Sequence, residues 1–304
     1  MNRPGLKVNI AGVELKNPVM TASGTFGSGL EYGEYVDLNK LGGVVTKGVA
    51  SIPWKGNAGV RVAETYGGML NSVGLQNPGI EEFIKKDIPF LRKHDTKIVV
   101  NIAGKTLEEY CSVVERLAGE DVDLLELNIS CPNVKEGGVC FGTDTKMVEY
   151  MVKEVKKIAK QPLIVKLTPN VTDIVSIAKA AEAAGADAIS LINTLLGMAI
   201  DIHKRRPVLG NIVGGLSGPA IKPVALRMVY QAANAVKVPI IGMGGIMTGE
   251  DAIEFLLAGA TAIAVGTANF VNPRATIDIL NGIEDYIIKH KEKDITSIIG
   301  SLNK

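Results

Sequence analysis

Short apolar runs rich in β-branched residues recur along the chain, and a stretch with helical spacing follows each of them. Several runs are continuously apolar instead of alternating, which is typical of strands covered on both faces of a parallel sheet. Strands that alternate with helices in this way predict parallel βα units. The predicted strands are residues 18–22, 43–48, 97–103, 124–130, 163–167, 188–193, 239–244 and 262–266.

The number of units decides the fold class. Eight units without a linker or a change of composition favour a single domain over residues 1–304, an α/β protein with one closed (β/α)8 TIM barrel. A doubly wound open sheet uses the same alternation, so only the count favours the barrel. Thr106 as a helix N-cap, Pro219 in a first turn and the helical spacing of residues 249–258 support the pattern.

Other segments predict the two ends of the barrel. LKVNIAGVELKN contains two short strands around Ala11 and Gly12, and we expect this β-hairpin to plug the closed bottom. Three connections, residues 49–79, 131–143 and 194–217, are longer than βα units need. Because this fold keeps its chemistry at the carboxyl ends of the strands, these long loops indicate the mouth of the site.

Composition and charge narrow the function classes. Apolar residues make up 46% of the chain and charged residues 21%, enough for a large core and a soluble surface. The net charge of +1 gives no field that would attract nucleic acid or an anionic membrane, so a small-molecule partner is expected. With neither a signal-peptide pattern nor an apolar run of membrane-spanning length, we expect a cytoplasmic protein.

Polar residues end several of the predicted strands, and these ends converge on one mouth. A single Asn at a strand end usually satisfies a backbone group, but three Asn and two Lys at matching ends are harder to explain in this way. Lys47 and Lys166 lie next to or within apolar sequence, so each needs an anionic partner or a stem that reaches the rim. The strand-end set is Ser23, Lys47, Asn101, Asn128, Lys166, Asn193, Gly244, Gly245, Gly266 and Thr267.

The last two predicted strands end in the glycine-rich sequences GMGGIMTG and AVGTANF. Glycines allow backbone amides to approach an anion, and (β/α)8 barrels frequently bind phosphate at this position. A tight turn explains any one such sequence. Two of them on adjacent final strands favour a ligand that carries a phosphate.

The cysteines are Cys111, Cys131 and Cys140, with no CxxC spacing, and the three histidines are scattered, so no metal site is expected. Cys131 follows the fourth strand in NISCPN. A buried cysteine is usually an inert small hydrophobe, but at the mouth, beside Asn128, a perturbed thiol could serve as a base.

Together these motifs resemble the class 1 dihydroorotate dehydrogenases, flavin enzymes of pyrimidine (UMP) biosynthesis. The resemblance covers nearly the whole chain, through NPVMTASGTFG, VVTKGV, GGMLNSVGLQNPG, NISCPN, VKLTPN, INT, GGLSGPAIKP, MGGIMTGEDA and AVGTANF. NISCPN combined with LNSVGLQNPG is highly specific, whereas many flavin and phosphate barrels share the glycine turns. The resemblance implies an FMN-dependent oxidation of (S)-dihydroorotate to orotate.

The resemblance also implies the residues of the site. FMN would contact Ser23, Lys47, Gly48, Asn101, Asn128, Lys166, Ile192 and Gly218, and its phosphate would contact Gly244, Gly245, Gly266 and Thr267. The substrate would contact Lys47, Asn71, Ser72, Val73, Gly74, Leu75, Asn128, Asn193 and Thr194. Lys47 and the backbone amides of residues 73–75 suit the substrate carboxylate.

The resemblance implies that Cys131 is the catalytic base, which removes the C5 proton of dihydroorotate while a hydride passes from C6 to N5 of FMN. The related class 2 enzymes use a serine here, so the cysteine indicates class 1. Lys166 would stabilise the anionic reduced flavin. Residues 131–143 would form a lid in which Gly137, Gly138 and Gly142 permit movement.

The segments GNIVGGLSGPAIKPVALRMVYQ and GGIMTGEDAIEFLLAGA resemble class 1B, which passes electrons to NAD through a subunit carrying FAD and a [2Fe–2S] cluster. This chain has no GxGxxG fingerprint and too few cysteines for a cluster, so an NAD-linked reaction requires that partner. We expect a homodimer that assembles with the partner into a heterotetramer.

Three alternatives stay open. A class 1A enzyme would pass its electrons directly to fumarate. A flavin barrel similar to the dihydropyrimidine dehydrogenases would oxidise another reduced pyrimidine, and carboxylate recognition by Lys47 and residues 71–75 separates it from the first interpretation. A phosphate-binding barrel without redox chemistry, such as an isomerase, would not bind FMN.

Overall fold

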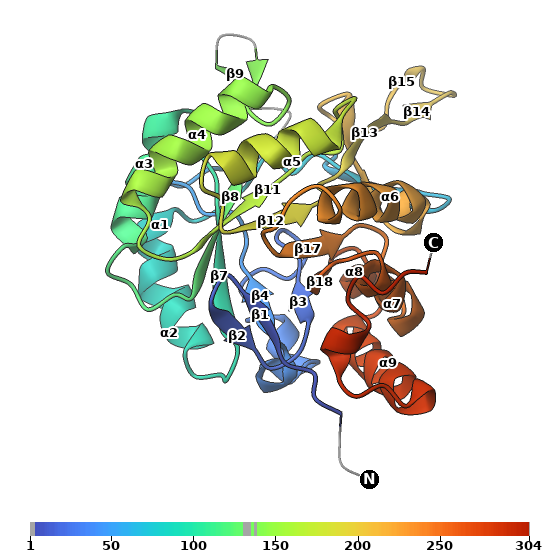
Figure 1. Ribbon diagram of the computed structural model, residues 1–304. Coiled ribbons are helices and arrows are strands. Elements are labelled where there is room, and N and C mark those ends of the chain that lie inside the picture. The colour runs from blue at the N-terminus through green and yellow to red at the C-terminus, as the bar shows by residue number, and fades with distance from the viewer. Residues whose placement is uncertain (1–3, 130–134, 137–138, 304) are drawn as a thin grey trace.

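A closed barrel of eight parallel strands forms the centre of the molecule (Figure 1). The computed structural model describes residues 4–129, 135–136 and 139–303. The strands follow chain order around the barrel, and the last pairs with the first. They are β3 (Val19–Thr21), β4 (Gly43–Val45), β7 (Lys97–Ile102), β8 (Leu124–Asn128), β11 (Leu163–Lys166), β12 (Ala188–Leu191), β17 (Ile240–Met243) and β18 (Ala262–Val265). The eight predicted strands and the predicted (β/α)8 barrel are confirmed.

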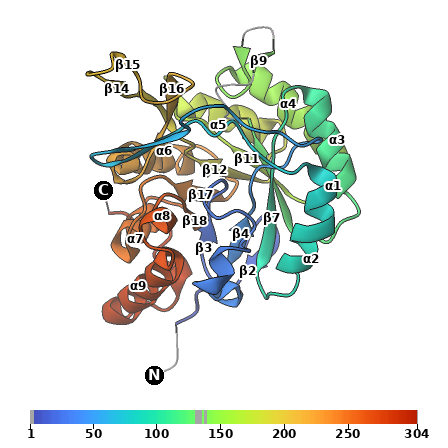
Figure 2. The same cartoon turned by 180° about the vertical axis from the view of Figure 1, so that it is seen from behind.

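Helices surround the strands in both views of the cartoon (Figures 1 and 2). None of those in the described part of the chain has both the length and the apolar character needed to cross a membrane. The α-helices are α1 (Ile80–Glu82), α2 (Ile88–Leu91), α3 (Leu107–Leu117), α4 (Thr145–Ile158), α5 (Ile174–Ala183), α6 (Lys222–Ala233), α7 (Gly249–Leu257), α8 (Ala268–Val271) and α9 (Ala275–His290). A π-helical segment, Phe83–Asp87, joins α1 to α2.

Helix α3 shows why these segments fold and pack as they do. As predicted, Thr106 is its N-cap, and the Thr106 side chain accepts a hydrogen bond from the N–H of Glu109 (3.4 Å). Its buried residues repeat at the spacing of one helical face, so α3 turns one side to the barrel. These residues are Tyr110, Val113, Val114 and Leu117.

The connection from β3 to β4 differs from the prediction that a helical stretch of ordinary length follows every strand. Residues 22–42, all of which the structure describes, contain only the short 3₁₀ turns Tyr32–Glu34 and Leu38–Lys40. Gly24, Gly27 and Gly29 adopt positive φ angles there. Glycine is a poor helix former, so a segment this rich in glycine folds as turns instead.

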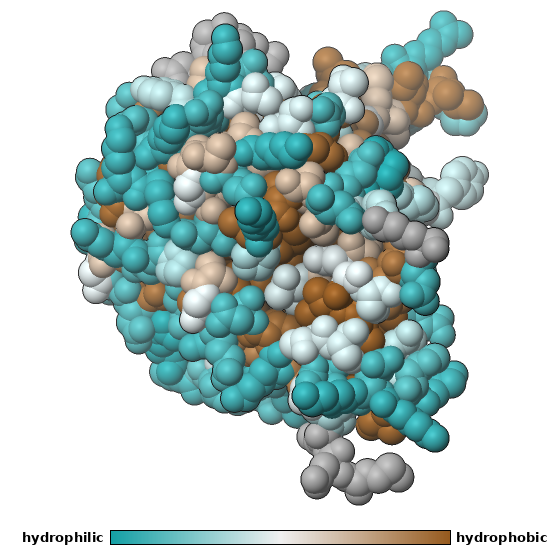
Figure 3. All heavy atoms as spheres, viewed as in Figure 1, coloured by the Kyte–Doolittle hydropathy of each residue, from teal (hydrophilic) through white to brown (hydrophobic). Residues whose placement is uncertain are grey.

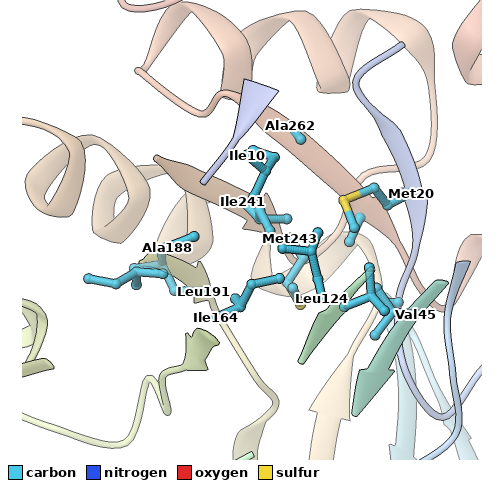
Figure 4. Close-up of a cluster of buried hydrophobic side chains, with 14 of the residues drawn as sticks. Ile10, Met20, Val45, Leu124, Ile164, Ala188, Leu191, Ile241, Met243 and Ala262 are labelled. Atoms are coloured by element: carbon cyan, nitrogen blue, oxygen red, sulfur yellow. The ribbon is translucent and has the colours of Figure 1, made fainter. Parts of the chain in front are cut away.

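The N-terminal hairpin is present as predicted. Strands β1 (Val8–Ile10) and β2 (Val13–Leu15) pair around Ala11 and Gly12, whose φ angles of 53° and 90° are those of a tight hairpin turn. Ile10 is fully buried and lies among side chains from the barrel strands, including Ile164 and Ile241 (Figure 4). The hairpin therefore adds to the barrel core.

Two of the predicted long loops together form a sheet that the sequence did not predict. Residues 49–79 contribute β5 (Val62–Thr65) and β6 (Gly68–Asn71), and residues 194–217 contribute β13 (Leu195–Met198) and β16 (Val213–Ser217). These strands pair in the antiparallel order β13-β16-β6-β5. We call this the roof sheet. The expectation of plain loops in these two segments was wrong, since each is half of a sheet.

Two small hairpins complete the strands. Strands β14 (Ile200–Asp201) and β15 (Arg206–Pro207) form a hairpin that projects from the molecule at the upper right of Figure 1. Strands β9 (Lys135–Glu136) and β10 (Val139–Cys140) pair within the third long connection.

Candidate active site

A cavity of about 240 Å³ opens at the carboxyl ends of the barrel strands, and all eight strand ends contribute to its lining. Every site residue predicted from the sequence lines this cavity, apart from Cys131, which lies outside the described residues. From the barrel come Ser23, Lys47, Gly48, Asn101, Asn128, Lys166, Ile192, Asn193, Gly244, Gly245, Gly266 and Thr267. Asn71, Ser72, Val73, Gly74, Leu75, Thr194 and Gly218 come from the roof sheet and adjoining segments.

The roof sheet brings together segments that lie far apart in the sequence. Asn71 of β6 pairs with Gly215 of β16, and the Asn71 amide donates to the Gly215 carbonyl (3.3 Å). A Cβ at Gly215 would lie 2.1 Å from Oγ1 of Thr194, so a side chain at position 215 would collide with Thr194. The roof thus places Asn71 and Thr194 over the same cavity.

Lys166, at the end of β11, is buried with an anionic partner. Its side chain is 4% exposed, so the alternative that its stem reaches the rim is wrong. Its Nζ donates to Oγ of Ser23 (3.0 Å) and lies 3.7 Å from a carboxylate oxygen of Glu126 on β8. Glu126 was missed in the sequence, although it interrupts the apolar strand LLELN in the way that Lys166 interrupts LIVKL.

Asn101 and Asn128 are held next to each other on neighbouring strands. The Asn128 amide donates to the Asn101 side-chain oxygen (3.4 Å), and the Asn101 amide donates to Glu126 (2.6 Å). The hydroxyl of Tyr110, on α3, donates to the backbone carbonyl of Asn128 (2.7 Å). Both side chains are therefore held in place where they line the cavity.

The segment from Ser72 to Leu75 has a backbone that other residues hold in place. Asn57 donates its amide to the Ser72 carbonyl and hydroxyl (both 3.0 Å), and its N–H donates to the Val73 carbonyl (3.0 Å). Gly74 and Leu75 both have positive φ, 75° and 52°. A leucine in this region is strained, which is typical of backbone that a binding site requires.

Asn77 fixes the other end of this segment. It is 7% exposed, its amide donates to the Leu75 carbonyl (2.8 Å), and its side-chain oxygen accepts from the N–H groups of Ala50 (3.1 Å) and Gly79 (2.9 Å). Asn57 and Asn77 do not line the cavity and were missed in the sequence, because only the fold shows what they contact.

The two glycine turns present backbone N–H groups to the cavity. Gly244 and Gly245 have φ angles of 123° and 80°, which L side chains rarely adopt. Among the described residues, the N–H groups of Gly245, Gly266 and Thr267 donate to no backbone carbonyl. The Thr267 hydroxyl donates to Ser217 (2.8 Å). These donors fit the oxygen atoms of a phosphate.

The remaining expectations concern residues that the structure describes only in part. Cys131, Gly137 and Gly138 lie outside the described residues, so the base and lid predictions remain predictions. Gly142 is described, and a Cβ there would lie 2.7 Å from the Ile129 carbonyl oxygen. Within the described residues, no three His, Cys, Asp or Glu side chains gather in a way that could hold a metal ion.

The fold and the cavity define a (β/α)8-barrel protein whose mouth is suited to a phosphate-bearing ligand. Residues 5–287 match the family described as dihydroorotate dehydrogenase, and the chain belongs to this family. The resemblance stated from NISCPN and LNSVGLQNPG is therefore confirmed. A dehydrogenase is an oxidoreductase, and membership in this family implies a flavin-dependent enzyme.

Several relatives match over all or nearly all of their length. The chain is 76% identical over 302 residues, 99% of this chain and 100% of the relative, to the protein of Alkaliphilus metalliredigens named dihydroorotate dehydrogenase B (NAD(+)), catalytic subunit. Proteins of the same name from Alkaliphilus oremlandii and Lachnoclostridium phytofermentans are 73% and 64% identical, over 99% and 96% of this chain and 100% and 98% of theirs. These names support class 1B over class 1A.

Proposed function

We propose that this chain is the catalytic subunit of an NAD-linked dihydroorotate dehydrogenase, which oxidises (S)-dihydroorotate to orotate in pyrimidine biosynthesis. The observation that carries the proposal is the full-length identity of 76% to a protein of that name. The cavity supports it, because residues from two long connections and eight strands line one space. The proposed unit is the whole chain, residues 1–304, acting as one FMN-binding barrel domain.

FMN is the proposed cofactor, and the cavity has groups that suit each of its parts. The N–H groups of Gly245, Gly266 and Thr267 would hold the phosphate. Polar side chains from β7, β8 and β11 would contact the ring. The proposed FMN contacts are those predicted above, Ser23, Lys47, Gly48, Asn101, Asn128, Lys166, Ile192, Gly218, Gly244, Gly245, Gly266 and Thr267. When bound, FMN supplies the hydride acceptor.

The substrate is proposed to bind between the barrel end and the roof. Lys47 carries the positive charge that a carboxylate needs, and the backbone of Val73–Leu75 is held rigid by Asn57 and Asn77. Asn71, Ser72, Asn128, Asn193 and Thr194 complete the proposed set. A dihydropyrimidine without a carboxylate would lack the group that Lys47 and the backbone of Val73–Leu75 are proposed to bind, which disfavours that alternative substrate.

Cys131 is proposed to be the base. It comes three residues after Asn128 in the sequence, and Asn128 lines the cavity. Its thiolate would accept the C5 proton, and the substrate loses a second hydrogen from C6 as hydride, so orotate forms with two hydrogens fewer. Residues 131–143 are proposed to cover the site during this step.

The electron route requires a partner. We propose that electrons pass to NAD through a subunit with FAD and a [2Fe–2S] cluster, in a heterotetramer built on a homodimer of this chain. Exposed apolar side chains support assembly, since Leu196, Met198, Ile200 and Ile202 are 47% to 73% exposed. Figure 3 shows hydrophobic surface at the upper right, where β14 and β15 project. The proposed compartment is the cytoplasm, where thiols stay reduced.

The test is anaerobic mixing of the purified chain with dihydroorotate while the flavin absorbance at about 450 nm is followed. Loss of the absorbance is expected, and added NAD should restore it only in the presence of the partner subunit. Direct recovery with fumarate would indicate class 1A. A flavin that stays oxidised would contradict dihydroorotate as substrate, and a chain that cannot be loaded with FMN would indicate a barrel without redox chemistry.

A further inference from the structure

Glu126 is a buried carboxylate behind the proposed flavin site. It lies on β8 and is 1% exposed. One carboxylate oxygen accepts from the amide of Asn101 (2.6 Å) and lies 3.7 Å from Nζ of Lys166, and the other accepts from the Ser190 hydroxyl (2.7 Å). These three partners come from β7, β11 and β12, so Glu126 connects four adjacent strands. Neither Glu126 nor Ser190 lines the cavity.

The surroundings of Glu126 are unusually polar for the inside of a barrel. The Asn101 amide and the Ser190 hydroxyl donate to its oxygens, and the Lys166 ammonium group lies beside them. The interior of such a barrel is ordinarily filled by branched apolar side chains, as at Leu124, two residues earlier on the same strand and therefore on the same face (Figure 4). A buried ion pair stabilises a fold no better than apolar packing of the same volume, so stability alone does not explain Glu126.

The position of Glu126 gives it a function through its neighbours. Lys166 and Asn101 line the cavity and are proposed flavin contacts, and Glu126 touches both from the side away from the cavity. Its charge attracts the ammonium group of Lys166 and offsets part of the positive charge that Lys166 presents to the cavity. In an interior with little water, this offset is stronger than at the surface.

We propose that Glu126 is a positioning residue that holds Lys166 and Asn101 in place behind the bound flavin and, by drawing the ammonium group of Lys166 away from the flavin and offsetting its charge, sets the flavin reduction potential. This inference rests on the proposed function, because it needs FMN in the cavity. Reduction by hydride adds two electrons and one proton, so the flavin gains one negative charge. Lys166 favours that charge and Glu126 limits the effect. Removing the charge of Glu126 therefore raises the potential.

The test compares the FMN-loaded wild-type chain with Glu126→Gln, which keeps the shape of the side chain and removes its charge. The potential is measured by anaerobic dithionite titration against a reference dye, with two electrons taken up per flavin. We expect the reduced flavin to be favoured roughly tenfold, a rise of about 30 mV for a two-electron couple. An unchanged or lower potential with FMN bound contradicts the proposal.

A second set of variants separates positioning from a direct effect of charge. In a Lys166→Gln background, Glu126→Gln should raise the potential by clearly less, because no lysine is left to release. An equally large rise there would overturn the role through Lys166. If Glu126→Gln does not retain FMN, Glu126→Asp takes its place in the test, because the shorter side chain moves the carboxylate away from Lys166. A smaller rise in the flavin reduction potential is then expected. No rise in that potential would overturn the proposal. A wild-type chain that binds no FMN would instead overturn the proposed function.

Discussion

At the scale of single residues, Cys131 and Cys111 form a natural pair for testing the proposed chemistry. Cys131→Ala should retain FMN, because Cys131 is not a proposed flavin contact, and should slow flavin reduction by dihydroorotate by about 10²–10⁴-fold, the usual contribution of a general base. Stopped-flow absorbance of the FMN-loaded chain measures this rate. Normal reduction in the variant would remove Cys131 from the base role.

Cys111 supplies the matched control. It lies on α3 and does not line the cavity, and burial, followed by the nearby Glu115 and Glu108, raises the pKa of its thiol. A raised pKa means less thiolate at neutral pH, so Cys111 is a poor base and a slow nucleophile. Cys111→Ala should therefore leave flavin reduction unchanged.

Asn57 tests whether the rigid segment beside the roof recognises the substrate. Asn57→Ala removes two hydrogen bonds to Ser72, each 3.0 Å long. We expect the KM for dihydroorotate to rise about tenfold, the effect of one to two net hydrogen bonds, with FMN affinity unchanged because Asn57 does not line the cavity. Steady-state kinetics and flavin titration measure the two effects.

The control for Asn57 is Asn234→Ala. Asn234 follows α6 and is exposed, and its side-chain amide donates to the Tyr230 carbonyl in the last turn of the same helix (2.7 Å). Its removal should leave KM as it is. A rise in the Kd of FMN equal to the rise in KM in Asn57→Ala would show that the whole cavity had changed and would contradict a role specific to the substrate segment.

These residues also show how far sequence reasoning reaches at this scale. Lys166 was predicted as a site residue because a charged residue inside an apolar strand requires a partner of opposite charge or a path to solvent. The structure places a carboxylate beside it. Glu126 gave the same signal but does not end its strand, so the search for strand-end residues passed over it. Asn57 gave no signal, because its importance comes from contacts made only after folding.

At the scale of elements, Asp251 joins α7 to α6. It completes a capping box with Thr248, and its side chain accepts from Lys222 (2.6 Å) and from the N–H groups of Met247 and Thr248 (both 2.9 Å). Burial alone would raise the pKa of Asp251, but these bonds outweigh it and hold the pKa below the ordinary 3.8. The ionised carboxylate therefore stabilises the folded chain.

Asp251→Asn should lower the free energy of unfolding by about 1 kcal/mol at neutral pH, the usual size of a helix cap and its charge. Because the folded pKa is the lower one, this contribution is complete above 3.8 and is lost as the pH falls through the folded value. Urea unfolding at several pH values measures it. A difference between variant and wild type that persists undiminished in strong acid would contradict the role of the charge.

Glu254→Gln is the matched control at this junction. Glu254 contacts the same lysine, Lys222, at 2.9 Å, but its side chain is 44% exposed and caps no helix. A surface ion pair of this kind contributes little. The variant should unfold with nearly the wild-type free energy.

The elements differ in how predictable they are, for a physical reason. The barrel strands are buried on both faces, so their apolar runs stand out in the sequence. Strand β5 alternates between exposed and half-buried positions, and β16 contains two glycines, so neither has a strong strand signal. The roof sheet forms because β6 pairs with β16, which lies far from it in the sequence. The local pattern of apolar and polar residues cannot show such long-range pairing.

At the scale of the whole molecule, the barrel explains why the site could be predicted better than the roof. Parallel closure brings every strand's carboxyl end to one mouth, so a strand correctly predicted also locates its last polar residue. The cavity lining accordingly includes residues from all eight strand ends. A single ligand that filled this cavity would contact the ends of all the barrel strands, and we therefore expect its binding to be coupled to the stability of the whole fold.

FMN should thus stabilise the entire barrel against unfolding. A ligand that binds only the folded chain adds about 2.7 kcal/mol at a concentration of 100 Kd, which is roughly a 5 °C rise in Tm for a chain of this size. Riboflavin, which has no phosphate, should give a smaller rise at equal concentration, because the N–H groups of Gly245, Gly266 and Thr267 then have no anion to bind. Calorimetry of the flavin-free chain with each ligand measures both. Equal rises in Tm for FMN and riboflavin would contradict phosphate binding at the glycine turns. No rise in Tm with saturating FMN would contradict a flavin site that involves all the strands.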